Sequence, residues 1–137
     1  MKSCEEVIYP QMRDNTLHSL DDLRDFDYQK MFQKKWQPYM ETHDSMPPDV
    51  GDWYDCATDI LIEDMDYLEN AHSYIGSVFK NSAEAEAMIH MAKVLFNFYK
   101  SCNSDSALEV IDCEGWSNVV EAAARTYRVL NPDELGT

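Results

Sequence analysis

The chain has 137 residues, the size of one ordinary domain, and a hydrophobic content of 45%, which is enough for one core and excludes a disordered protein. Its 11 Lys and Arg residues face 26 Asp and Glu residues, giving a formal net charge of −15. This charge disfavours nucleic acid and anionic membranes as partners and favours basic proteins. The sequence shows neither an apolar run near the roughly 18 residues of a membrane span nor an N-terminal secretory signal. We therefore expect a single cytoplasmic domain over residues 1–137.

The first half of the chain predicts three helices and one long loop. Proline fits a first helical turn, so the first helix is expected from Pro10 to Arg24. Asp25 is placed to cap a second helix that ends near Trp36. Three prolines and a glycine predict a loop over residues 37–51. A third helix is then expected from Asp52 to Tyr67 or Leu68.

The second half predicts two long helices and shorter elements. A short helix is expected over Ser73–Lys80, followed by a long helix that Ser82 caps and that ends near Tyr99. Residues 107–113 fit either a strand-like segment or one helical turn. The last helix is expected over Glu114–Leu130, where Asn131 and Pro132 stop it. The predicted fold is all-α, a compact single-domain bundle of about five or six helices.

The third predicted helix carries a stripe of carboxylates. At its helical spacing these side chains share one face, and they are Asp52, Asp55, Asp59, Glu63 and Asp66. Like charges at such spacings destabilise an isolated helix by about 0.2–0.5 kcal/mol per pair, so the stripe does not favour folding. It is either a solvated outer face or a surface that binds a cationic protein. In the second interpretation Tyr54 is an aromatic anchor beside the stripe, whereas Trp53 is expected to pack in the core.

Asp64 falls on the apolar side of the same predicted helix. A buried carboxylate needs a partner or a raised pKa. We expect a structural pair, with Arg13, Arg125, Arg128 or a Tyr hydroxyl as the partner.

The motifs of known catalytic and cofactor sites are missing. The chain has no nucleophile elbow, no phosphate-binding glycine loop and no zinc-protease motif. Glu69 and His72 form one half of a di-iron motif, but a second half is absent. We therefore predict no enzyme activity, no cofactor and no metal, and keep a metal-dependent enzyme built on Glu69 and His72 as the least favoured alternative.

The four cysteines, Cys4, Cys56, Cys102 and Cys113, are far apart and form no C-x-x-C pair. In a cytosolic domain with its own core this favours reduced thiols. We expect Cys56 to pack in the core as a small hydrophobic side chain.

Several short segments resemble a family of small, acidic, largely uncharacterised bacterial helical proteins. They are Tyr9–Arg13, Ile75–Gly76, Glu84–Ala87, Gly115–Trp116 and Val119–Ala123. Proteins of this kind are often immunity proteins, which neutralise a toxin delivered by neighbouring bacteria. The resemblance implies a binding protein that blocks a cationic toxin domain, with a nuclease as the expected class. The alternative from another class is a nucleic-acid mimic that occupies a DNA-binding protein with its carboxylates.

Overall fold

The computed structural model describes residues 7–102, 104 and 106–132. Over these ranges the regular structure is helical, and no strand forms apart from an isolated bridge between Ile75 and Phe79. The all-α prediction is therefore confirmed. Among the described helices, none combines the length and the apolar character needed to cross a membrane.

The described chain contains α-helices together with shorter π-helical and 3-10 turns. In order they are α1 (Pro10–Arg24), α2 (Phe26–Met40), α3 (Trp53–Thr58), the π-helical turn η2 (Asp59–Asp64), α4 (Tyr67–Asn70), the 3-10 turn η3 (Ala71–Tyr74), α5 (Ser82–Ser101), the 3-10 turn η4 (Val110–Asp112) and α6 (Trp116–Leu130).

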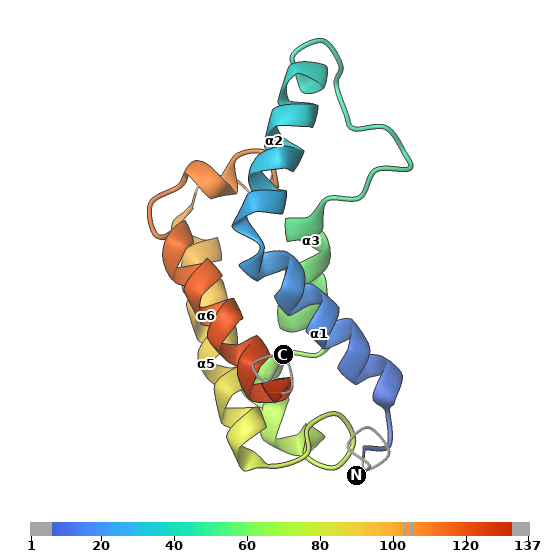
Figure 1. The fold of residues 1–137 in the computed structure, drawn as a ribbon, viewed down its shortest axis with the longest axis vertical. Coiled ribbons are helices and arrows are strands. Elements are labelled where there is room, and N and C mark those ends of the chain that lie inside the picture. Colours follow the sequence, from blue (N-terminus) through green and yellow to red (C-terminus); the bar gives the residue numbers. More distant parts are fainter. Residues whose placement is uncertain (1–6, 103, 105, 133–137) are drawn as a thin grey trace.

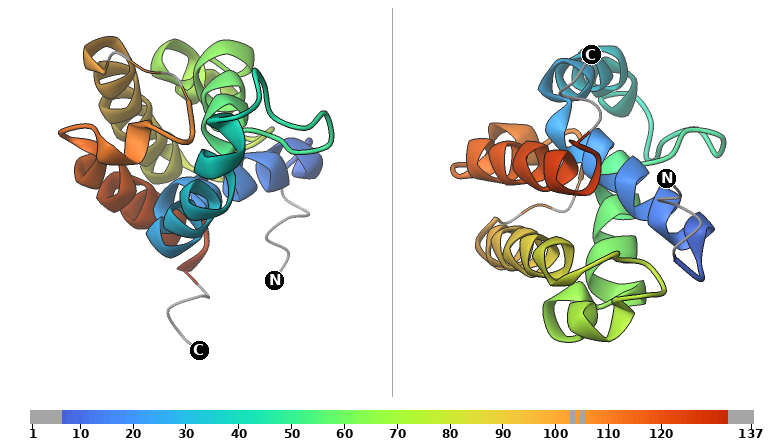
Figure 2. Two further views of the ribbon diagram at one scale, coloured as in Figure 1. Left: turned by 90° about the horizontal axis from the view of Figure 1, so that it is seen from above. Right: turned by 60° about the horizontal axis from the view of Figure 1, so that its bottom comes forward.

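The bundle is built around α1, α5 and α6. α6 packs against both α1 and α5, while α3 packs on α1, and α4 and η3 pack on α5 (Figures 1 and 2). The largest fully buried side chains include Trp116, Tyr54, Tyr67 and Phe79. α2 extends past the end of the bundle, and residues 41–52 return as an open loop to α3 (Figure 1).

The predicted bounds of the first helix are correct, and Asp25 caps the second as predicted. The Asp25 carboxylate accepts the Tyr28 N–H at 3.0 Å. α2, however, continues past its expected end at Trp36 to Met40. Pro38 lies in the last turn of this helix and removes one backbone hydrogen bond, the one that an N–H at this position would donate to the Lys34 carbonyl.

The predicted helix over Ser73–Lys80 is wrong. The chain forms η3 and then a turn at Gly76, whose φ of 96° favours glycine. This turn receives the segment before α1, since the Tyr9 N–H donates to the Ser77 carbonyl at 2.7 Å. The cap of α5 is also one residue earlier than predicted, because Asn81 and not Ser82 accepts the N–H of Glu84.

Candidate functional site

Asp52, the first residue of the predicted stripe, is the N-cap of α3. One carboxylate oxygen accepts the backbone N–H groups of Tyr54 and Asp55, both at 3.0 Å. The other accepts the Ala107 N–H at 3.1 Å, which ties the start of α3 to a segment 55 residues away. Asp52 therefore has a structural role in addition to its charge.

Tyr54 is not an accessible anchor, because its side chain has 0% exposure. Its ring lies edge-on to the rings of Phe98 and Trp116, with centroids 6.3 and 5.8 Å away. Trp53 is also buried, as expected, and its ring lies 5.6 Å from that of Trp116. Both aromatic residues at the start of α3 thus belong to the core, where their rings lie against Trp116 of α6.

Asp55 is exposed and Asp59 half-buried, and their charges act on the Cys56 thiol together with the charge of a carboxylate that the stripe did not include. Burial raises the pKa of the Cys56 thiol, and the negative charges of Asp55, Asp52, Asp59 and Asp22 raise it further. Asp22 belongs to α1, so two helices bring their carboxylates to one place.

The carboxylates of α1 extend this surface toward α2. Burial raises the pKa of Asp22, nearby His18 lowers it, and Asp21 and Asp25 raise it. Asp22 and Asp25 also raise the pKa of the Tyr28 hydroxyl, after burial as the largest cause. We define the acidic surface as Asp21, Asp22, Asp25, Asp52, Asp55 and Asp59. The signal for its α1 part was present in the sequence, as three Asp residues between positions 21 and 25.

Glu63 and Asp66 lie beyond a change in helix type. The Met65 N–H donates to the Ile60 carbonyl at 3.0 Å, a bond of the π-helical kind, and Asp66 then adopts a left-handed φ of 49°. The prediction of one continuous helix from Asp52 to Tyr67 is therefore wrong. Glu63 is exposed and Asp66 half-buried, but they do not continue a regular α-helical row.

Asp64 is exposed, so the expected buried pair does not form there. The apolar positions Ala57, Leu61 and Met65 recur every four residues through the π-helical turn, which keeps Asp64 outside the buried side. The expected partner Arg13 is buried and pairs with Glu84 of α5 instead.

The cysteine predictions also need correction. Cys102 and Cys113 are joined in a disulfide, with Cα atoms 6.4 Å apart, and are not reduced thiols. Their spacing of 11 residues carries no local signal, because the pairing follows from the packing of α5 beside α6. Cys56 is exposed and not in the core. Cys4 lies outside the described residues.

Glu69 and His72, the half-motif of a di-iron site, are not joined by further metal-ligating side chains among the described residues. His72 lies 3.8 Å from the Glu86 carboxylate, and both side chains are more than half exposed. Within residues 7–102, 104 and 106–132, no group of three His, Cys, Asp or Glu side chains is arranged to hold a metal ion.

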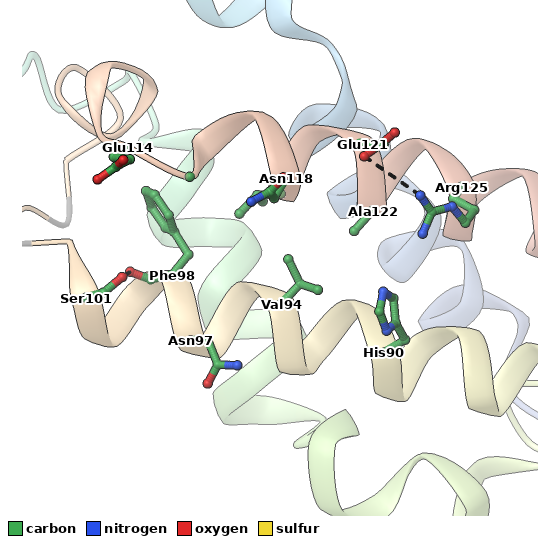
Figure 3. A pocket seen from close by; sticks show the side chains of 12 residues that line it. His90, Val94, Asn97, Phe98, Ser101, Glu114, Asn118, Glu121, Ala122 and Arg125 are labelled. Atoms are coloured by element: carbon green, nitrogen blue, oxygen red, sulfur yellow. Dashed lines mark hydrogen bonds and ion pairs between the residues drawn. The ribbon is translucent and has the colours of Figure 1, made fainter.

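A groove of about 450 Å³ runs between α5 and α6 (Figure 3). His90 and Arg125 lie at one end and Ser101 and Glu114 at the other. The Ser101 hydroxyl donates to the Phe98 carbonyl, and it is separated from His90 by eleven positions, or about 16 Å, along one helix. This arrangement does not form a nucleophile–base pair, which requires hydrogen-bond distance.

Comparison with known proteins supports no further assignment of the site. No curated protein and no solved structure matches the chain. A family model does match residues 7–135, which is nearly the whole chain. The chain therefore belongs to the family described as a domain of unknown function, DUF7945.

Proposed function

We propose that this protein is an immunity-type inhibitor that binds a cationic toxin domain, of the nuclease class, through its acidic surface. One observation carries the proposal. The charges of Asp22 on α1, of Asp55 on α3 and of Asp59 at the start of η2 all act on the thiol of Cys56 and, after burial, raise its pKa. A surface built from two separate helices is a feature of the tertiary fold and not of one helix's composition.

The convergence does not favour folding by itself. Like charges held close together repel, and neighbouring like charges on a helix cost about 0.2–0.5 kcal/mol per pair. A cationic partner would relieve this repulsion and would be steered toward the surface before contact. The formal net charge of −15 acts in the same direction at longer range.

Tyr28 is the aromatic side chain that can take the anchoring role that buried Tyr54 cannot. It is 41% exposed, and the charges of Asp22 and Asp25 act on its hydroxyl. Tyrosines are enriched among the residues that dominate binding energies. The proposed interface is therefore the acidic surface with Tyr28 at its edge.

A nuclease toxin fits this surface by its chemistry. Nucleases bind a polyanion, so cationic side chains line their substrate groove. Carboxylates placed on that groove would pair with those side chains and exclude the substrate. The nucleic-acid-mimic alternative needs carboxylates in a long regular row, and the π-helical turn after Thr58 interrupts such a row.

The test measures association with cationic nuclease toxin domains, starting with any that is encoded beside this gene. We expect an on-rate above the ~10⁵–10⁶ M⁻¹s⁻¹ of uncharged pairs, falling as salt rises. The triple variant Asp22→Asn, Asp55→Asn, Asp59→Asn should lower the on-rate at low salt by about tenfold. Its melting temperature should hold or rise, because repulsion is relieved.

The matched control changes three exposed carboxylates outside the acidic surface: Glu41→Gln, Asp44→Asn and Asp49→Asn. It alters the net charge equally, so it separates the local surface from the overall charge. The control should keep most of the on-rate. If it loses as much as the first triple variant, the acidic surface is an ordinary solvated face and the proposal fails.

A further inference from the structure

We propose that Cys102 and Cys113 form a reversible thiol–disulfide site that exchanges with cationic small disulfides and holds residues 106–112 against α2 and Asp52. The exchange chemistry stands on the cysteine pair and its neighbours alone. Its consequence for the acidic surface rests on the proposed function.

The sulfur pair can be reached from solvent. Cys102 follows the end of α5, and Cys113 lies between η4 and α6, with both residues half-buried. They line a surface groove of about 430 Å³ together with Ser104, Glu109 and Glu114. Their Cα separation of 6.4 Å is within the usual range for a disulfide. Exposed disulfides are reduced more readily than buried structural ones, so this bond belongs to the class that exchanges with external thiols.

The bond restrains a segment that touches two functional elements. The Ala107 N–H donates to the Asp52 carboxylate at 3.1 Å. The Gln33 amide of α2 donates to the Leu108 carbonyl and to the Asp112 carboxylate, both at 2.8 Å. The segment therefore links the start of α3, which carries the acidic surface, to α2, which carries Tyr28.

Reduction of the disulfide removes the cross-link that restrains residues 106–112. Both helices stay in place because they pack directly on each other. The segment between them then has more conformations to lose when it docks, so its contacts with Asp52 and Gln33 weaken. Reduction should loosen this segment without unfolding the bundle.

The chemistry is thiol–disulfide exchange. One protein thiolate attacks a sulfur of the external disulfide, whose S–S bond breaks and releases one small thiol. The second protein thiolate attacks the protein sulfur of the mixed disulfide and releases the second small thiol. Two protein thiols are thereby oxidised to one disulfide, and the external disulfide is reduced to two small thiols. The two protons lost by the protein thiols end on the two small thiols.

The groove selects among small disulfides by charge. Exposed Glu109 and Glu114 line it, and the whole chain is strongly anionic. Negative reagents are repelled and positive ones attracted, an effect that salt screens. Cystamine is cationic and glutathione disulfide is anionic, so these two reagents are the probes.

The first experiment starts from the reduced full-length protein and follows formation of the Cys102–Cys113 bond by mass spectrometry. At low salt, cystamine should form the bond at least about tenfold faster than glutathione disulfide. Each rate is first divided by the rate of the same reagent with a neutral peptide dithiol, which removes the intrinsic difference in reactivity between the two reagents. The ratio should shrink in high salt and in the variant Glu109→Gln, Glu114→Gln. Absence of the bond with both reagents, or the same ratio in that variant, overturns the site.

The second experiment compares hydrogen exchange in the oxidised and reduced proteins. The Ala107 amide should exchange at least about tenfold faster after reduction and in Cys113→Ser, while Cys56→Ser should behave as wild type. Equal protection in both redox forms overturns the proposed restraint.

Fluorescent deca-lysine then reports on the acidic surface and should bind the oxidised form with the higher on-rate. If protection changes and binding to the two forms is equal, the link to the acidic surface is wrong. If deca-lysine binds neither form, the proposed function fails and the exchange site stands.

Discussion

The guanidinium of Arg13 and the carboxylate of Glu84 form a two-pronged ion pair inside the protein, with N–O distances of 2.7 and 3.0 Å. Arg13 is 2% exposed and Glu84 4%. The same guanidinium donates to the carbonyls of Val78 and Leu130, and Glu84 also accepts the Lys80 N–H. One side-chain pair thus joins α1, α5, the end of α6 and the turn before α5.

Removing one member of this pair should be strongly destabilising. Arg13→Met leaves a buried carboxylate without its cation, which costs about 3–5 kcal/mol. The double variant Arg13→Met, Glu84→Met should recover part of that loss, because no buried charge remains. The recovery is incomplete because the Val78 and Leu130 carbonyls and the Lys80 N–H lose their partners. Urea denaturation of the single and double variants measures both effects. A double variant less stable than either single variant would contradict this account.

Gln29 should be the most sensitive polar position at the corner between α1 and α2. Its amide nitrogen donates to the Asp22 and Leu23 carbonyls at 2.7 and 2.9 Å, and its oxygen accepts the Trp116 indole N–H at 2.9 Å. Gln29→Ala removes partners from buried groups, so we expect a loss of about 2 kcal/mol or more. Exposed Gln11→Ala is the control and should change the free energy of unfolding by less than about 0.5 kcal/mol.

Cys56 reports on the acidic surface without any partner. Its thiol is exposed, but burial and the neighbouring carboxylates raise its pKa, so little reactive thiolate is present near neutral pH. The triple variant Asp22→Asn, Asp55→Asn, Asp59→Asn should react several-fold faster with iodoacetamide, measured by peptide mapping. The reaction rate with iodoacetate should increase more than the rate with iodoacetamide, because iodoacetate is anionic and the wild-type carboxylates repel it. Equal rates in wild type and variant would mean that these carboxylates do not surround the thiol.

The pH dependence of stability should carry a contribution from Asp22. Burial, with Asp21 and Asp25, raises the pKa of its carboxyl above the ordinary 3.8, despite the opposing effect of His18. The folded protein therefore binds this proton more readily than the unfolded chain. Its contribution to stability is present at low pH and is lost as pH rises through the window above 3.8.

Asp22→Asn should remove that loss, so the variant gains stability relative to wild type as pH increases through this window. Urea denaturation at a series of pH values measures the difference. Asp14→Asn, at an exposed position of the same helix, controls for the change in net charge. A difference between wild type and Asp22→Asn that is constant with pH would show that the carboxyl titrates alike in both states.

Local signals in the sequence determined the helical class and several helix ends. Pro10 and Asp25 act within one turn of their own positions, so the bounds of α1 and the start of α2 could be predicted. Asn131 and Pro132 likewise predicted the end of the last helix at Leu130. Such signals depend on neighbours three or four residues away, which the sequence contains directly.

Only the tertiary structure decided the orientation of Tyr54 and Asp64, the pairing of Cys102 with Cys113, and the meeting of Asp22 with Asp55 and Asp59. Each depends on how the elements pack, which the spacing of residues along one regular α-helix does not specify. The π-helical turn at residues 59–64 is the clearest case, because Leu61 and Met65 on either side of Glu63 and Asp64 are buried while these two carboxylates are exposed.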